Sequence, residues 1–179
     1  MRHAFRYLIL FAFIKTLPLS PLLAAEGSAA SDERKATILS LLQRDVKWRS
    51  QPKGEKFVYG VFGDKAVQEK LQAKLAGVRF QNLPVEVRNV ENIEQAIACQ
   101  VLFIPLKRNA DWRVINGGEV RPGVLTVGES LDFIDKGGVI RIGPMTAPTI
   151  EVHLANAKTA QLQLPFSLVQ VAKRKLKEH

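Results

Sequence analysis

Four consecutive apolar residues, Val101-Leu102-Phe103-Ile104, decide the fold class of this chain. A short, continuous apolar run of this kind is typical of a strand that is covered on both faces of a parallel sheet. Before and after it, strand-like segments alternate with helical patterns along the chain. This order predicts a single three-layer α/β domain, in which helices flank a mainly parallel sheet and residues 101–104 form a central strand.

The other strands are expected on both sides of this central run. Upstream, residues 56–62 are rich in β-formers, and Val85 and Val87 alternate with charged residues; downstream, residues 124–127 are also rich in β-formers. Two last strand-like segments, residues 139–142 and 149–152, are separated by Gly143, Pro144 and Pro148. They predict an antiparallel hairpin at the C-terminal edge of a sheet of about five or six strands.

Helices are predicted between these strands from capping residues and apolar spacing. After a flexible stretch at residues 26–30, Ser31 and Asp32 are candidate caps of a first helix. Asp64 and Asn92 are candidate caps of later helices, and Pro165 is placed to start the last helix at its first turn. The expected apolar stripes are Ile38, Leu42 and Val46; Val67, Leu71 and Leu75, ended by Gly77; Ile93, Ala96 and Ile97; Trp112 and Ile115, ended by Gly117-Gly118; Leu131 and Ile134, closed by Gly137; and Phe166, Val169, Ala172 and Leu176.

The first 25 residues have the pattern of a signal peptide. Arg2, His3 and Arg6 form a basic start, residues 7–14 are apolar, and Leu23-Ala24-Ala25 precedes the predicted cleavage site. A helix needs about 20 apolar residues to cross a bilayer, so we expect export and cleavage rather than a membrane anchor. The mature domain is then assigned to residues 31–179, in the periplasm, with no transmembrane span.

Composition and charge exclude some classes of partner. Without the leader the chain keeps 23 basic and 17 acidic residues, a net charge of +6, which favours acidic surfaces. Export argues against nucleic acid as the partner. The basic run Lys173-Arg174-Lys175, with Lys177, is expected on the solvated face of the last helix, where it complements the helix dipole.

Several motifs in their order along the chain resemble the YfiR-like family of small periplasmic proteins. These motifs are residues 57–64 (Phe-Val-Tyr-Gly-Val-Phe-Gly-Asp), the central strand, Gly123-Val124-Leu125-Thr126-Val127-Gly128, Gly137-Gly138, the segment Ile150-Glu151-Val152-His153-Leu154, and a tryptophan just past the first helix, Trp48. The best-known members of the family repress a membrane-bound diguanylate cyclase. The resemblance implies structural roles for Trp48, Gly128, Gly137 and Gly138.

Two positions depart from the family pattern. Relatives often carry paired cysteines, whereas Cys99 is the single cysteine here and the usual partner position falls within Tyr59-Gly60-Val61. No internal disulfide can form, and a buried, inert thiol is expected. His153 stands where the family usually has asparagine, and we expect it to imitate the hydrogen bonding of that asparagine.

No catalytic constellation emerges from the sequence. Residues 60–63 lack the spacing of a phosphate-binding loop, and the mature domain has too few His and Cys residues to suggest a metal site. Ser130 lacks the second glycine of a nucleophile elbow, so a capping role is expected. We therefore predict no enzyme and no cofactor.

A charged rim is the one candidate site for a ligand or partner. Asp64, Lys107, Arg108 and Glu129 are expected where strands end, the side on which α/β sheets usually hold ligands. They would either line a small crevice or form an ordinary exposed rim.

Two functions remain open. In the first, the domain binds and restrains the periplasmic region of an inner-membrane signalling protein, which the family resemblance suggests is a diguanylate cyclase. In the second, it senses a small ligand and reports to a histidine kinase or a transport system. The oligomeric state also stays open, with a homodimer among the alternatives.

Overall fold

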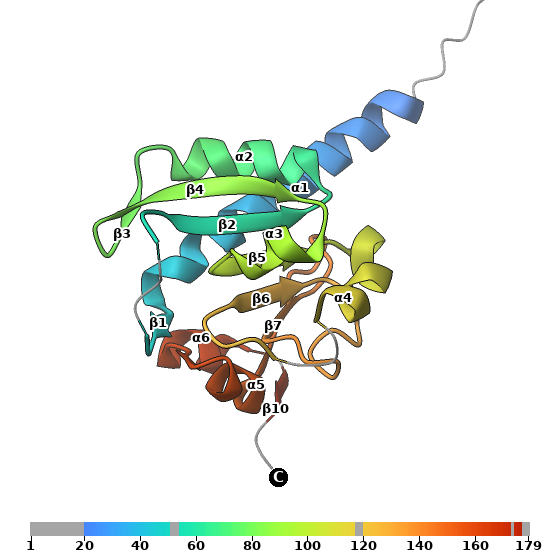
Figure 1. Ribbon diagram of the computed structural model, residues 1–179. Helices are drawn as coiled ribbons and strands as arrows, with labels where there is room; N and C mark the ends of the chain where they lie inside the picture. The colour runs from blue at the N-terminus through green and yellow to red at the C-terminus, as the bar shows by residue number, and fades with distance from the viewer. Residues whose placement is uncertain (1–19, 51–53, 117–119, 173, 177–179) are drawn as a thin grey trace, which may run out of the picture.

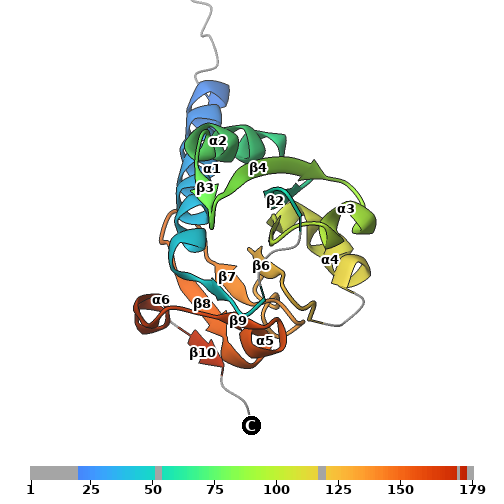
Figure 2. The same cartoon turned by 60° about the vertical axis from the view of Figure 1, so that its left-hand side comes forward.

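The computed structural model describes residues 20–50, 54–116, 120–172 and 174–176. The chain forms a curled, mostly parallel sheet with helices on both faces (Figures 1 and 2). This confirms the predicted α/β class. The predicted signal peptide lies mainly outside the described residues, since residues 1–19 are not described.

The main sheet has the strand order β10-β8-β7-β6-β5-β2-β4-β3. Its strands are β2 (Phe57–Phe62), β3 (Arg79–Phe80), β4 (Leu83–Val90), β5 (Val101–Ile104), β6 (Leu125–Gly128), β7 (Ile140–Ile142), β8 (Ile150–His153) and β10 (Arg174–Leu176). All four residues of β5 are buried, as the apolar run predicts. Within the described residues the sheet has eight strands instead of five or six. Strands of two or three residues, such as β3 and β10, leave no apolar pattern long enough to recognise in the sequence.

The predicted antiparallel hairpin is present but is not at the edge of the sheet. β7 and β8 pair antiparallel, and Arg141 and Glu151 lie opposite each other with 2.6 Å between their charged atoms. β10 adds parallel to the outer side of β8. A separate two-stranded sheet joins β1 (Lys47–Trp48) to β9 (Leu162–Gln163).

Helices form one layer on each face of the sheet. On one face lie α1 (Ser20–Asp45), α2 (Lys65–Leu75), α5 (Leu154–Thr159) and α6 (Phe166–Val171); on the other lie α3 (Ile93–Ile97) and α4 (Asn109–Asn116), which follows the short helix η1 (Leu106–Arg108). The buried residues divide accordingly into two clusters. Tyr59 and Phe103 face the first layer, whereas Phe62 and Leu102 face the second.

The first helix is longer than predicted. α1 runs through residues 26–30, which were expected to be flexible, and through Ser31 and Asp32, which were expected to cap it. Alanine residues in this segment favour a helix. Asp32 lies within the helix, where its Oδ1 is 3.7 Å from Lys35 Nζ. The predictions for α2 and α3 are confirmed at their N-caps: Asp64 accepts from Val67 N and Asn92 from Gln95 N. Ile97, however, is 52% exposed rather than buried.

Two other helix predictions are wrong. Residues 131–137 form turns, because Phe133 inserts between Gly128 and Gly138 and leaves Leu131 78% exposed. The last helix ends at Val171, since Ala172 adopts an extended conformation. Residues 174–176 are therefore in β10, so Arg174 and Lys175 are not on a helix, and Phe166 is 74% exposed rather than directed inward.

Candidate functional site

The charged rim forms where three neighbouring strands end. β6, β5 and β2 are adjacent and parallel, so the chain leaves them at one edge of the sheet. Asp64 follows β2 and is only 7% exposed. Its Oδ2 lies 3.1 Å from Lys107 Nζ, while Oδ1 caps α2. The structure thus brings Asp64 and Lys107 together as an ion pair.

Glu129 lies at the same edge but has different partners. Its Oε1 is 3.0 Å from Lys35 Nζ in α1, and its Oε2 accepts a hydrogen bond of 2.9 Å from the backbone N–H of Leu106. Both Glu129 and Lys35 are largely buried. The carboxylate therefore ties α1 to the segment after β5.

Arg108, the fourth rim residue, is held against the protein surface. Its guanidinium carbon lies 4.5 Å from the centre of the Phe62 ring, and its Nε lies 2.7 Å from Asp111 Oδ2. It also packs over Gly63, where a side chain would crowd it. The rim charges are thus engaged with other groups of the chain, and Lys107, 58% exposed, is its most open cation.

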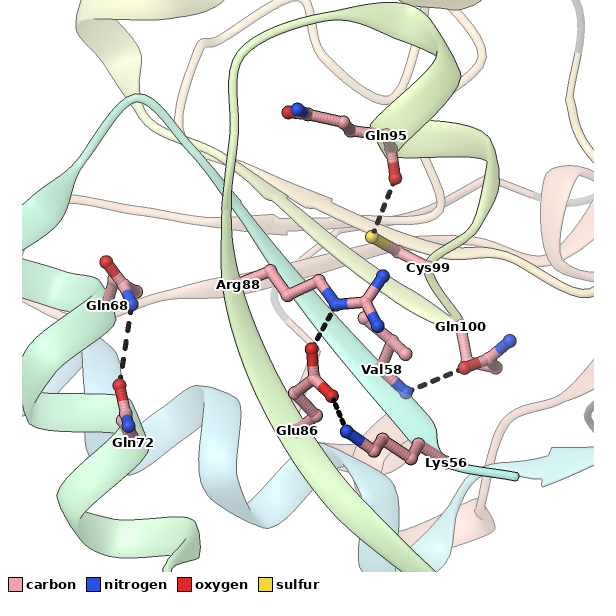
Figure 3. Close-up of polar contacts among 9 residues, drawn as sticks. All are labelled: Lys56, Val58, Gln68, Gln72, Glu86, Arg88, Gln95, Cys99 and Gln100. Atoms are coloured by element: carbon pink, nitrogen blue, oxygen red, sulfur yellow. Dashed lines mark hydrogen bonds and ion pairs between the residues drawn. The ribbon is translucent and has the colours of Figure 1, made fainter. Parts of the chain in front are cut away.

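Cys99 is enclosed between α3 and the sheet (Figure 3). It is 1% exposed, its Sγ donates to the carbonyl of Gln95 at 3.3 Å, and burial raises its pKa to about 11. A Cβ at Gly60 would lie 2.6 Å from this sulfur. The residue at position 60 must therefore be small when Cys99 is a free thiol.

Beside Cys99, Glu86 is bound by two cations (Figure 3). Arg88 Nε and Lys56 Nζ contact its two carboxylate oxygens, and the hydrogen bonds from Arg88 and then Lys56 lower the pKa of Glu86 to about 2. The carboxylate of Glu86 and the two cations are thus paired with one another beside β2 and β4.

The remaining residues singled out from the sequence have these surroundings. Trp48 stacks edge-on against Phe57 and Phe80, with ring centres 5.2 Å apart in both cases, and donates from Nε1 to Gly123 O. His153 Nδ1 accepts from Asn156 N at the start of α5. Gly128 and Gly138 border the ring of Phe133, and Gly137 has a φ of +92°.

The structure shows a second candidate site, which the sequence-based reasoning missed. It is an apolar groove of about 280 Å³ between α1, β8 and α6, lined by Ile38, Leu41, Leu42, Ile150, Pro165, Ser167, Leu168 and Val171. Leu41 is 48% and Val171 68% exposed. The sequence signal was present in α1, where Leu41 widens the apolar arc beyond the stripe that one buried face requires.

The described residues offer neither a metal site nor a membrane span. No set of three or more His, Cys, Asp or Glu side chains there is arranged to hold a metal ion. In the same part of the chain, no helix is both long enough and apolar enough for a membrane span.

Comparison with known proteins gives one strong match. The model of the family described as DUF4154, YfiR/HmsC-like, matches residues 32–173. No curated protein matches the chain.

Two solved structures resemble the chain only weakly. A conserved domain protein from Vibrio cholerae O1 biovar El Tor is 10% identical, with a TM-score of 0.49 over 80% of this chain and 60% of that one. An ABC domain from Streptococcus pneumonia, in complex with L-Trp, is 11% identical, with a TM-score of 0.46 over 82% of this chain and 60% of that one. This chain thus spans about three fifths of each of these two proteins. The family match, by contrast, covers most of the chain and confirms the resemblance seen in its motifs: the chain belongs to the YfiR/HmsC-like family.

Proposed function

We propose that this protein is exported to the periplasm, where it binds and restrains the periplasmic region of an inner-membrane diguanylate cyclase and so lowers cyclic di-GMP. The observation that carries this proposal is the family match over residues 32–173, because the YfiR/HmsC-like family is regulatory and its members are periplasmic. The signal peptide predicted at residues 1–25 would direct the export of the protein. A repressor of this kind acts by binding the inactive state of its partner more tightly than the active state.

The apolar groove is the surface that we propose for this contact. It leaves Leu41 and Val171 largely in water, although burying such side chains is favourable by roughly 25 cal/mol per Å². The charged rim is a weaker candidate, since its carboxylates are already paired inside the chain. The contact should therefore depend little on salt, whereas a contact steered by rim charges would weaken as salt rises.

Gene deletion and complementation test the proposal. Loss of the gene should raise cellular cyclic di-GMP and promote biofilm formation. The full-length gene should reverse both effects, whereas a gene lacking residues 1–25 should fail because the domain stays on the wrong side of the membrane. Equal rescue by both genes, or no change in cyclic di-GMP on deletion, would remove the cyclase proposal.

The alternative function is a sensor that binds a small ligand and reports to a histidine kinase or a transport system. The groove supports this alternative, because its volume of about 280 Å³ would hold a small apolar molecule. Unchanged cyclic di-GMP on deletion, together with a ligand-induced shift in the melting temperature of the mature domain, would establish it.

A further inference from the structure

A second cavity, separate from the apolar groove, is also lined by α1. It lies beside β3, at the opposite end of the sheet from β10. It has a volume of about 520 Å³. Its lining residues come from α1, the end of α2 and the β3–β4 hairpin, elements that Figure 2 labels. We call it the cationic pocket. It is lined by Ser40, Arg44, Lys74, Leu75, Val78, Arg79, Phe80 and Gln81.

The cations of this pocket outnumber the anions around it. Among the side chains that the structure describes, Arg44 and Arg79 form no ion pair, and Arg79 donates to the carbonyl of Asn82. Lys74 Nζ lies 2.5 Å from Glu33 Oε1, and Lys70 shares the same carboxylate at 3.6 Å. Two lysines thus share one carboxylate here, whereas in the charged rim Asp64 and Glu129 each pair with a different lysine.

One wall of the pocket, the ring of Phe80, is held in place by packing against other aromatic rings. The ring of Phe80 lies 4.3 Å from that of Phe57 and 5.2 Å from that of Trp48, measured between centres. The carbonyl of Leu75, at the end of α2, accepts from Val78 N at 3.1 Å. That carbonyl is therefore engaged, which reduces its repulsion of an anion at this helix end.

We propose that the cationic pocket binds a phosphate group, carried either by a small phosphorylated molecule or by the headgroup of an anionic phospholipid. Arginine pairs with phosphate through two parallel hydrogen bonds, and Arg44 and Arg79 are the two guanidinium groups that line the pocket. Lys74 adds a third positive charge. Glu33 then acts as an internal competitor, because it holds Lys74 in the absence of the ligand. This proposal does not depend on the proposed function.

The test is titration of the mature domain with sodium phosphate at constant ionic strength, followed by NMR. Resonances of Arg44, Lys74 and Arg79 should shift and saturate. Arg79→Gln should weaken binding roughly tenfold, as expected for the loss of charge-assisted hydrogen bonds. Glu33→Gln should strengthen binding by freeing Lys74. The matched control is Lys65→Gln, which removes one exposed positive charge at the other end of α2 and should leave affinity unchanged.

A second arm identifies the source of the phosphate. The domain is centrifuged with vesicles of phosphatidylcholine alone or mixed with phosphatidylglycerol. Saturable binding of free phosphate supports a small phosphorylated ligand; Arg79-dependent binding to mixed vesicles without saturable phosphate binding supports a lipid headgroup. The proposal is overturned if neither probe binds, or if Lys65→Gln weakens binding as much as Arg79→Gln does.

Discussion

The charged rim and the apolar groove differ in what their side chains contact. The charges of the rim are paired within the chain, whereas apolar side chains of the groove are exposed to water. In the rim, Asp64 pairs with Lys107 at 3.1 Å and Glu129 with Lys35 at 3.0 Å. In the groove, Leu41 and Val171 keep about half or more of their surface in water. The rim therefore holds α1, α2 and the strand ends together, whereas the groove retains apolar area that no other described part of the chain covers.

This comparison depends on α1, because the helix contributes Lys35 to the rim and Leu41 to the groove. The predictions below test first whether the scaffold holds α1 in place, and then whether the two regions behave as differently as their contacts indicate.

The largest expected loss of stability is that of Trp48→Ala, in β1 just after the end of α1. The indole is 7% exposed and contacts two aromatic rings, so its removal should cost about 3 kcal/mol or more of unfolding free energy. Urea denaturation of the mature domain measures this. Trp48→Phe is the milder control, and an unchanged midpoint in Trp48→Ala would show that α1 is held without this contact.

Thiol labelling should separate the open groove from the closed core. With its pKa raised to about 11, Cys99 has roughly a hundredfold less reactive thiolate at pH 8 than an ordinary cysteine. A cysteine introduced by Leu41→Cys should react quickly with a water-soluble maleimide, while Cys99 stays protected until the protein unfolds. Mass spectrometry of the modified peptides measures both rates; comparable rates in the native protein would contradict the enclosed position of Cys99.

Gly128→Ala tests the support of the rim, since Gly128 directly precedes Glu129. A Cβ there would come within 2.3 Å of the Phe133 ring, and such overpacking typically costs about 1–3 kcal/mol. Thermal denaturation should show a clear loss. The control is Gly27→Ala, where no atom lies within 4 Å of the new Cβ and stability should not fall.

The smallest effect is expected at the rim itself. Lys107 is 58% exposed, so its ion pair with Asp64 should contribute less than about 1 kcal/mol. Lys107→Ala should leave the urea midpoint nearly unchanged, and high salt should reduce even that difference. A loss comparable to that of Gly128→Ala would mean that the exposed Asp64–Lys107 pair stabilises the fold far more than its 58% exposed lysine indicates.

The sequence predicted the parts of the fold that depend on long apolar runs and on local caps. β5, the β7–β8 hairpin and the caps Asp64 and Asn92 follow from such signals. The end of α6 and the pairing of β10 depend instead on contacts between distant segments, which no local pattern encodes. The rim residues were assigned to one edge from topology alone, but the pairing of Glu129 with Lys35 required knowing where α1 lies.

The groove was missed for a related reason. Phe166, Val169, Ala172 and Leu176 were assigned to one inward stripe because they share helical spacing. The helix is too short to present that stripe, so Leu168 lines the groove instead. Periodicity gives the faces of a helix but not the residue at which the helix ends.

The most direct test of the central claim compares the groove with the rim in cells that lack the gene. Cyclic di-GMP is measured after complementation with the full-length wild type, with Leu41→Glu or Val171→Glu in the groove, and with Lys107→Ala in the rim, at matched periplasmic levels of folded protein. The account predicts that the wild type and Lys107→Ala restore low cyclic di-GMP, while both groove variants leave it high. Full rescue by the groove variants, together with loss of rescue by Lys107→Ala, would contradict it.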